Sequence, residues 1–152
     1  MKKQVRAKKL AENRRAYYDY QILETYEAGL VLRGYEVKAI KTGHVSLKGS
    51  YVMIKDGQVY LINAVIPPYQ PANTPDNYDP ERNRRLLLKK SEINSLIGKS
   101  KQKGLTLVPL RLYTKRGKIK IEFALGRGKR KIDKRELIKK REVEREIKRL
   151  GG

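Results

Sequence analysis

LTLVPLRLYTKRGKIKIEFALG, residues 105–126, is the stretch of sequence that decides the fold. It contains two runs of residues that favour strands, 105–113 and 118–126, and the Arg116–Gly117 pair between them predicts a turn. Along the second run, polar positions alternate with four apolar ones: Ile119, Ile121, Phe123 and Leu125. Strict alternation is typical of a strand that buries one face and leaves the other in solvent.

Further strands are predicted around this unit. Asp56–Gly57 separates SYVMIK from QVYLIN, and such a pair between two β-rich runs predicts a two-residue hairpin, because both turn positions need positive φ. Residues 17–29 read as a strand with Tyr18, Tyr20 and Ile22 on one face. Pro109 predicts an edge or a bulge in its strand, because proline donates no hydrogen bond.

Helices and irregular segments are expected between the strands. Five of the six prolines fall in residues 67–80, which predicts an irregular surface loop. Asp79–Pro80 is a good helix start and predicts a short helix over 81–90, while Ser91 is a second cap for a helix that Gly104 stops. Residues 28–41 allow either a strand or a helix, because Gly34 weakens the helical pattern.

The order of these elements predicts a mostly β protein. We expect an oligonucleotide-binding (OB) type of antiparallel barrel with outlying short helices over residues 16–125. Residues 1–15 are predicted to be a flexible or weakly helical basic arm, and residues 126–152 a basic C-terminal tail.

Charge is the strongest functional signal. Lys and Arg total 37 against 16 Asp and Glu, a formal net charge of +21. Such a surplus destabilises a compact chain unless a polyanion neutralises it, and nucleic acid is the commonest such partner. An anionic membrane is the alternative, but no apolar run is long enough to span a bilayer and no leader-like segment is visible, so we expect a cytoplasmic protein and no membrane partner.

Enzymatic signals are weak. The chain has no cysteine, and His44 is its one histidine, so neither a thiolate metal site nor a histidine pair is available. We therefore expect no enzyme, no metal and no cofactor. The basic segments 1–15, 82–90, 115–120 and 127–149 indicate phosphate binding instead, although each alone is typical of a solvated face. The ten tyrosines are either ordinary strand residues or platforms that stack on unpaired bases.

The tail contains helix-favouring pairs, Glu136 with Lys140 and Glu144 with Lys148. So polar a helix is marginal alone, because nucleation is costly. We expect it to be disordered in the free protein and helical when an RNA surface neutralises it; a merely solubilising tail is the alternative.

Three separated segments resemble one known family. They are NRRAYYDYQILETYEAGLVLRGYEVKAIKTGHVSLKGSYV from residue 13, DPERNRRLLLKKSEI from residue 79, and LVPLRLYTKRGKIKIEFALGRGKRKIDKR from residue 107. Together they are similar in order and spacing to the bacterial SsrA-binding proteins, the small protein B (SmpB) family of trans-translation.

The resemblance implies a function. Members of this family have an OB-type barrel, are not enzymes, bind the tRNA-like domain of transfer-messenger RNA and deliver it to stalled ribosomes. They occupy the ribosomal A site at the decoding centre, and their tail enters the vacant mRNA channel. For this chain the resemblance therefore implies ribosome rescue and peptide tagging by a protein that is monomeric when free. A structural ribosomal protein bound to rRNA is the alternative, because basic tails and small barrels suit that class too.

The resemblance also implies site residues. Those expected to bind the tRNA-like domain are Asn13, Tyr20, Glu27, Tyr51, Leu87, Lys120, Arg127 and Gly128. Those expected to bind the ribosome are the tail residues Lys129, Arg130, Lys131, Ile132, Asp133, Lys134 and Arg135. Ile132 departs from the family, in which His or Tyr is frequent at this place, so base stacking there is not expected and an apolar contact is.

Two of these residues have structural alternatives. Leu87 is predicted either to lie beside the RNA or to pack a helix against the barrel. Glu27 cannot attract phosphate, so it either accepts hydrogen bonds from a base edge or orients a cation, or else forms a structural ion pair.

Overall fold

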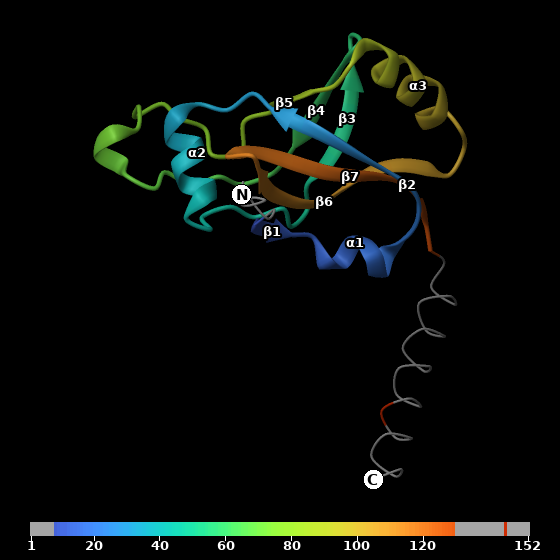
Figure 1. Cartoon of the computed structure of the whole chain (residues 1–152), viewed down its shortest axis with the longest axis horizontal. Coiled ribbons are helices and arrows are strands. Elements are labelled where there is room, and N and C mark those ends of the chain that lie inside the picture. The colour runs from blue at the N-terminus through green and yellow to red at the C-terminus, as the bar shows by residue number, and fades with distance from the viewer. Residues whose placement is uncertain (1–7, 130–144, 146–152) are drawn as a thin grey trace, which may run out of the picture.

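The fold is a single antiparallel sheet with short helices around it (Figure 1). The computed structural model describes residues 8–129 and residue 145. The elements in chain order are β1 (Lys8–Glu12), α1 (Arg14–Asp19), β2 (Tyr20–Leu30), α2 (Gly34–Lys41), β3 (Tyr51–Lys55), β4 (Gln58–Ile62), the 3₁₀ turn η1 (Pro71–Asn73), β5 (Arg84–Leu87), α3 (Lys90–Ser100), β6 (Leu105–Lys115) and β7 (Lys118–Gly128). The strand order is β1-β6-β7-β2-β5-β4-β3.

Both predicted hairpins are confirmed. Asp56 and Gly57 have φ of 51° and 72°, and Arg116 and Gly117 have φ of 52° and 76°. Two successive residues in the left-handed region match the right-handed twist of the flanking strands. The turns set the register, so that Lys55 pairs with Gln58 and Lys115 with Lys118. The four apolar residues expected on one face of β7 are all buried.

Pro109 lies at a β-bulge. The β6–β7 register shifts between Pro109 and Arg111, as the sequence predicts. Beside the bulge, Asn13 donates from its backbone N–H to Leu110 O at 2.7 Å. This bond holds the residue before α1 on β6.

The sheet buries two apolar clusters. The larger lies on the inner face, where α2 contributes Ala39 and Ile40 and α3 contributes Ile93 and Leu96. The smaller lies on the outer face, where Ala16 of α1 packs with Val108, Leu110 and Ala124. Helices therefore cover part of each face.

The closed barrel expected from the sequence is not seen in the hydrogen bonding. The sheet is open, with β1 and β3 at its two ends in the described part of the chain. It nevertheless curls, because β3 contacts β6, which lies five places away in the strand order. The coarser expectation, a mostly antiparallel β protein with a few short helices, is confirmed.

Two local predictions near the N-terminus differ from the structure, and the ambiguous segment 28–41 is resolved. Residues 17–19 belong to α1 rather than to a strand, because Ala16 docks on the outer face and β2 starts only at Tyr20. The predicted arm includes a strand, since residues 8–12 pair with β6. The segment 28–41, left open between strand and helix, holds the end of β2 and then α2, which begins at Gly34.

The segment 81–90 is not a helix. Asp79 and Pro80 lead into a turn in which Glu81 N–H donates to Asp79 Oδ1 at 2.9 Å. Strand β5 follows, paired with β2 on one side and β4 on the other. Its RRLL sequence alternates in burial, with Arg84 and Leu86 inside and the others outside.

The reason for this alternation is a buried ion pair. Glu36 of α2 and Arg84 are both fully buried, and Arg84 Nη2 lies 2.8 Å from Glu36 Oε2. Arg82 donates to the same carboxylate, and Tyr78 OH lies 3.2 Å from it. Burial raises the pKa of Glu36, but hydrogen bonds from Arg82, the Arg33 backbone and Arg84 bring that pKa below its ordinary value. The network ties α2, the proline-rich loop and β5 together.

We expect Arg84→Met to lower the free energy of unfolding by about 3–5 kcal/mol, because it leaves a buried carboxylate without its main partner. Arg85→Met is the matched control, since the neighbouring side chain is exposed and its loss should change stability by no more than about 0.5 kcal/mol. Urea unfolding of both variants is the measurement. Similar losses for the two would contradict a structural role for the buried pair.

Candidate nucleic-acid interface

The residues predicted to bind RNA gather in two groups at opposite ends of the β2–β7 pair. This pairing runs from Tyr20 opposite Gly128 to Gly29 opposite Lys120. The first group lies at the Tyr20 end and contains Asn13, Tyr20, Tyr51, Arg127 and Gly128. The second lies at the Gly29 end and contains Glu27, Leu87 and Lys120.

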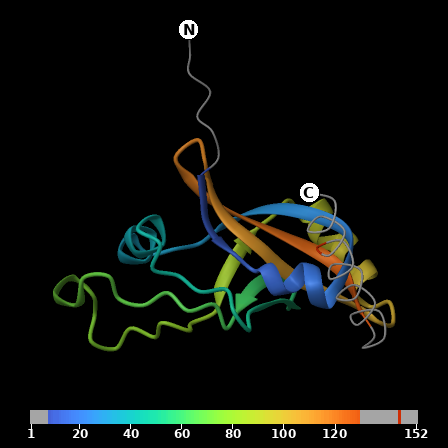
Figure 2. The same cartoon turned by 90° about the horizontal axis from the view of Figure 1, so that it is seen from below.

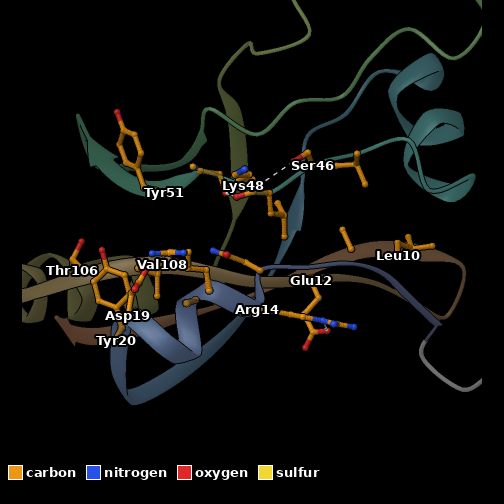
Figure 3. Close-up of a pocket in the computed structure, with 18 residues that line it drawn as sticks. Leu10, Glu12, Arg14, Asp19, Tyr20, Ser46, Lys48, Tyr51, Thr106 and Val108 are labelled. Carbon is orange, nitrogen blue, oxygen red and sulfur yellow. Dashed lines mark hydrogen bonds and ion pairs between the residues drawn. The ribbon is translucent and has the colours of Figure 1, made fainter. Parts of the chain in front are cut away.

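The first group borders a cleft of about 790 Å³. One wall is formed by residues 45–51, with Ser46, Lys48 and Tyr51, and the other by β1, α1 and the first half of β6 (Figure 3). Tyr20 and Tyr51 lie at the same end of the cleft on opposite walls, and Arg14 lies toward the other end. The cleft thus presents aromatic rings together with cations.

Asn13 has a structural task in this cleft. Its Nδ2 donates to Pro109 O at 3.0 Å, which holds the start of α1 against the β6 bulge. The amide nitrogen is therefore used within the fold. Among the described residues we find no hydrogen-bond donor to its Oδ1, which is the atom left for a ligand.

A close approach to glycine positions Tyr20. A Cβ added to Gly126 would lie 3.2 Å from Tyr20 Cβ and 3.3 Å from the backbone oxygen of Gln21. Such contacts are tighter than ordinary packing allows, so only glycine lets β2 carry a tyrosine here. Tyr51, at the start of β3, is 42% exposed, so its ring is available to stack on a base.

The second group is built around Gly29. A Cβ on Gly29 would meet Leu87 Cβ at 3.5 Å and Lys120 Nζ at 3.6 Å, which are ordinary packing distances, so both side chains lie close to this glycine. Leu87 is 48% exposed and lies in a strand, which excludes the alternative that it packs a helix against the sheet. An exposed leucine thus lies beside a lysine on the outer face of the sheet.

Glu27 forms an ion pair within the protein, which is one of the two roles predicted for it from the sequence. Tyr113 OH donates to Glu27 Oε2, and Lys115 Nζ lies 3.1 Å from Glu27 Oε1. The hydrogen bond from Tyr113 lowers the pKa of Glu27 despite desolvation, and Lys115 and Lys120 lower it further. Burial and the same hydrogen bond raise the pKa of Tyr113. Glu27 is therefore an anion that holds neighbouring donors in place.

Several cations near these groups have no carboxylate partner. Eight ion pairs are seen among the described residues, and none of them uses Lys48, Lys120 or Arg127. Arg127, a member of the first group, is exposed near the end of β7. These side chains can bind phosphate without first breaking a salt bridge within the described residues.

The described residues give no support for a metal centre or a membrane span. Within them, no three His, Cys, Asp or Glu side chains come close enough to hold a metal ion. None of the helices in this part of the chain is both long and apolar enough to cross a bilayer.

The sequence model of the SmpB protein family matches residues 10–151. The chain belongs to the SmpB family. An SsrA-binding protein of Caldicellulosiruptor saccharolyticus is 54% identical over 145 residues, which are 95% of this chain and 91% of that protein. Another, from Thermosipho africanus, is 54% identical over 141 residues, with 92% and 94% covered. One from Trichormus variabilis is 51% identical over 142 residues, with 93% and 92% covered.

A solved structure is also similar. A chain from a study of tmRNA–SmpB in the bacterial ribosome superimposes with a TM-score of 0.65 at 50% sequence identity, covering 84% of this chain and 92% of that one. The relatives are SsrA-binding proteins rather than structural ribosomal proteins, so the alternative raised from the sequence is not favoured.

Of the tail residues that the SmpB resemblance marks for the ribosome, only Lys129 lies within the described part of the chain. Its backbone N–H donates to Asp19 O at 2.8 Å, and its Nζ donates to Tyr17 O at 3.2 Å. The tail therefore leaves the sheet beside the end of α1. Residues 130–135 lie outside the described residues, and β7 itself extends to Gly128.

Some residues beside the two groups were not predicted from the sequence. Arg14, Arg15 and Lys48 line the cleft of the first group. Tyr113 orients Glu27 from 86 residues away in the sequence. The basic N-terminal run signalled the two arginines, but nothing in the local sequence pairs Tyr113 with Glu27.

Replacing Gly126 by Ala should lower the free energy of unfolding by about 1–3 kcal/mol, because its methyl group would crowd Tyr20 and the β2 backbone. Gly128→Ala is the matched control two residues along the strand, where an added Cβ meets nothing within 4 Å. Thermal unfolding of the two variants is the measurement. If both were equally stable, the close approach at Gly126 would not be what positions Tyr20.

Proposed function

We propose that this chain binds the tRNA-like domain of transfer-messenger RNA and delivers it to stalled ribosomes for trans-translation. The observation that carries this conclusion is the match over almost the whole chain to SsrA-binding proteins, together with the match to a chain from tmRNA–SmpB in the bacterial ribosome. Its charge fits a polyanionic partner. The protein acts by binding and positioning RNA rather than by catalysis, and its place of action is the cytoplasm, where ribosomes translate.

The two groups divide the work of binding. Lys120 and Arg127 neutralise phosphates, and Tyr20 and Tyr51 stack on unpaired bases across the mouth of the cleft. Glu27 does not contact phosphate; it orients Tyr113 and Lys115 and offers carboxylate oxygens to a base edge. Gly128 lets the RNA backbone come close to the end of β7. The proposal is supported by the exposure of Tyr51 and Arg127, and by the fact that neither Lys120 nor Arg127 forms one of the salt bridges among the described residues.

An OB-type barrel is the proposed description of the sheet. Its support is the contact between β3 and β6, which shows that an open hydrogen-bonded sheet curls toward closure. In OB folds the curled face and the loops around it bind nucleic acid. The cleft between residues 45–51 and the β1–α1 segment lies where this curling brings distant parts of the chain together.

The tail is proposed to act on the ribosome. Residues 126–152 carry twelve Lys or Arg against five acidic residues, so a phosphate-lined channel would neutralise them. Ordering a marginal helix then costs less, because the repulsion between its charges is removed. The barrel and the tail thus have separate partners: transfer-messenger RNA and the mRNA channel.

Loss of one phosphate contact should be visible in the salt dependence of binding. We expect Lys120→Ala to weaken binding to the tRNA-like RNA and to reduce the slope of log K against log salt by about one. Lys41→Ala, at the exposed end of α2, removes the same charge away from both groups and should leave the slope unchanged. Filter binding at several salt concentrations measures both variants. Equal slopes for the wild type and Lys120→Ala would show that Lys120 does not contact a phosphate of the RNA.

Removing residues 130–152 should spare binding to free transfer-messenger RNA and abolish peptide tagging on stalled ribosomes. The cut is placed after Lys129 so that its contacts with α1 are kept. A chain with the same tail residues in scrambled order separates sequence from charge, and we expect it to tag poorly as well. Equal loss of RNA binding and tagging on truncation would instead place the tail in the primary RNA site.

A further inference from the structure

The end of the molecule formed by α2 and the proline-rich loop has no part in the two groups described above. In both views the loop projects beyond α2, away from α3 and from the end of β7 (Figures 1 and 2). Tyr69 is exposed there by 41%, although a large ring is costly to leave in water. The loop also carries Gln70, just before η1, and Asn73, the last residue of η1.

A pocket of about 250 Å³ lies between the loop and α2. Gly34, Tyr35 and Lys38 line it from the helix, and Tyr69, Gln70 and Asn73 line it from the loop. Lys38 is exposed and takes part in none of the ion pairs among the described residues. One site thus combines two aromatic rings, a cation and two amides.

The side-chain amides of Gln70 and Asn73 are arranged so that they can hydrogen-bond to the polar edge of a ligand. Asn73 Nδ2 donates to Gln70 Oε1 at 2.9 Å, which orients both groups. Within the described residues, Gln70 Nε2 and Asn73 Oδ1 have no further side-chain partner, so the pair offers one donor and one acceptor. A nucleobase edge presents the complementary acceptor and donor, and its face can stack on tyrosine.

The pocket is held in shape by the buried ion pair. Tyr35 packs edge-on against Tyr78, with ring centroids 5.0 Å apart. Tyr78 OH donates to Ile66 O at 2.7 Å and accepts from Arg84 Nη2 at 2.9 Å, which anchors the loop to β5 and α2. The rings of Tyr69 and His44 are in contact, with centroids 5.2 Å apart. Four prolines restrict the backbone conformation of the loop up to Tyr78. A preorganised pocket loses less entropy when it binds a ligand.

We propose that this pocket is a further RNA-binding site, which takes one unpaired nucleotide: its base stacks on Tyr69, its polar edge meets the Gln70–Asn73 pair, and its phosphate meets Lys38. The inference rests on the proposed function, because it assumes an RNA partner. The nucleotide belongs either to transfer-messenger RNA or to ribosomal RNA, which offer the same chemistry.

The test uses the full chain with Tyr69→Ala, Lys38→Ala and two matched controls. Tyr69→Phe keeps the stacking ring, and Lys41→Ala removes a cation from the same helix outside the pocket. One arm measures the affinity for free transfer-messenger RNA. The other measures the affinity of the protein–RNA complex for ribosomes stalled on truncated messages. Thermal unfolding confirms that each variant is folded.

We expect Tyr69→Ala to weaken binding roughly tenfold in one arm, and Tyr69→Phe and Lys41→Ala to stay within about twofold of the wild type. Loss in the first arm assigns the nucleotide to transfer-messenger RNA, and loss in the second arm alone assigns it to ribosomal RNA. Wild-type affinity of Tyr69→Ala and Lys38→Ala in both arms would overturn the inference. Failure of the wild type itself to bind would instead overturn the proposed function.

Crosslinking separates RNA from protein as the occupant of the pocket. A photoreactive benzoylphenylalanine at position 69, in the complex with stalled ribosomes, should crosslink to RNA. A crosslink to a ribosomal protein in place of RNA would overturn the proposed nucleotide site.

Discussion

The antiparallel pairing of β2 with β7 determines where the core residues and most of the proposed RNA-binding residues lie. Because side chains alternate along paired strands, the register that turns Ala28, Ile121 and Phe123 inward also turns Glu27 and Lys120 outward. The same pairing puts Tyr20 opposite Gly128 at one end and Gly29 opposite Lys120 at the other. At one end Gly126 leaves space for Tyr20 that a side chain would fill, and at the other end Leu87 and Lys120 lie close to Gly29. A slip of one residue would exchange the core with the proposed RNA-binding face.

The charge balance explains why this face remains available to a ligand. In the described residues, some cations form ion pairs with acidic side chains, and these pairs link strands and helices. The acidic partners are Glu12, Asp19, Glu24, Glu27, Glu36 and Glu122. With 37 Lys and Arg against 16 acidic residues, many cations stay unpaired. Exposed ion pairs add little stability, so the surplus is not a device for folding. It is balanced when phosphates lie along the sheet and the tail, which fits membership of the SmpB family.

Local patterns predicted the parts of the fold that local chemistry decides. The sequence predicted both hairpin turns, at Asp56–Gly57 and Arg116–Gly117. It also predicted the alternation along β7 and an edge or a bulge at Pro109. The prediction of a helix over 81–90 was wrong, because Arg84 is drawn inward by Glu36, which lies 48 residues away. The link between Glu27 and Tyr113 was hidden for the same reason. The family resemblance named residues from both groups, but only the register of the strands shows that they lie at two separate ends of the β2–β7 pair.

The central claim is that RNA contacts the protein at both ends of the β2–β7 pair. An NMR titration of the ¹⁵N-labelled full chain with the tRNA-like domain of transfer-messenger RNA tests it most directly. The account predicts amide shift changes around Tyr20, Tyr51 and Arg127 and again around Gly29, Leu87 and Lys120, with smaller changes on the inward-facing strand positions between them. Changes confined to one end, or confined to the tail, would contradict it.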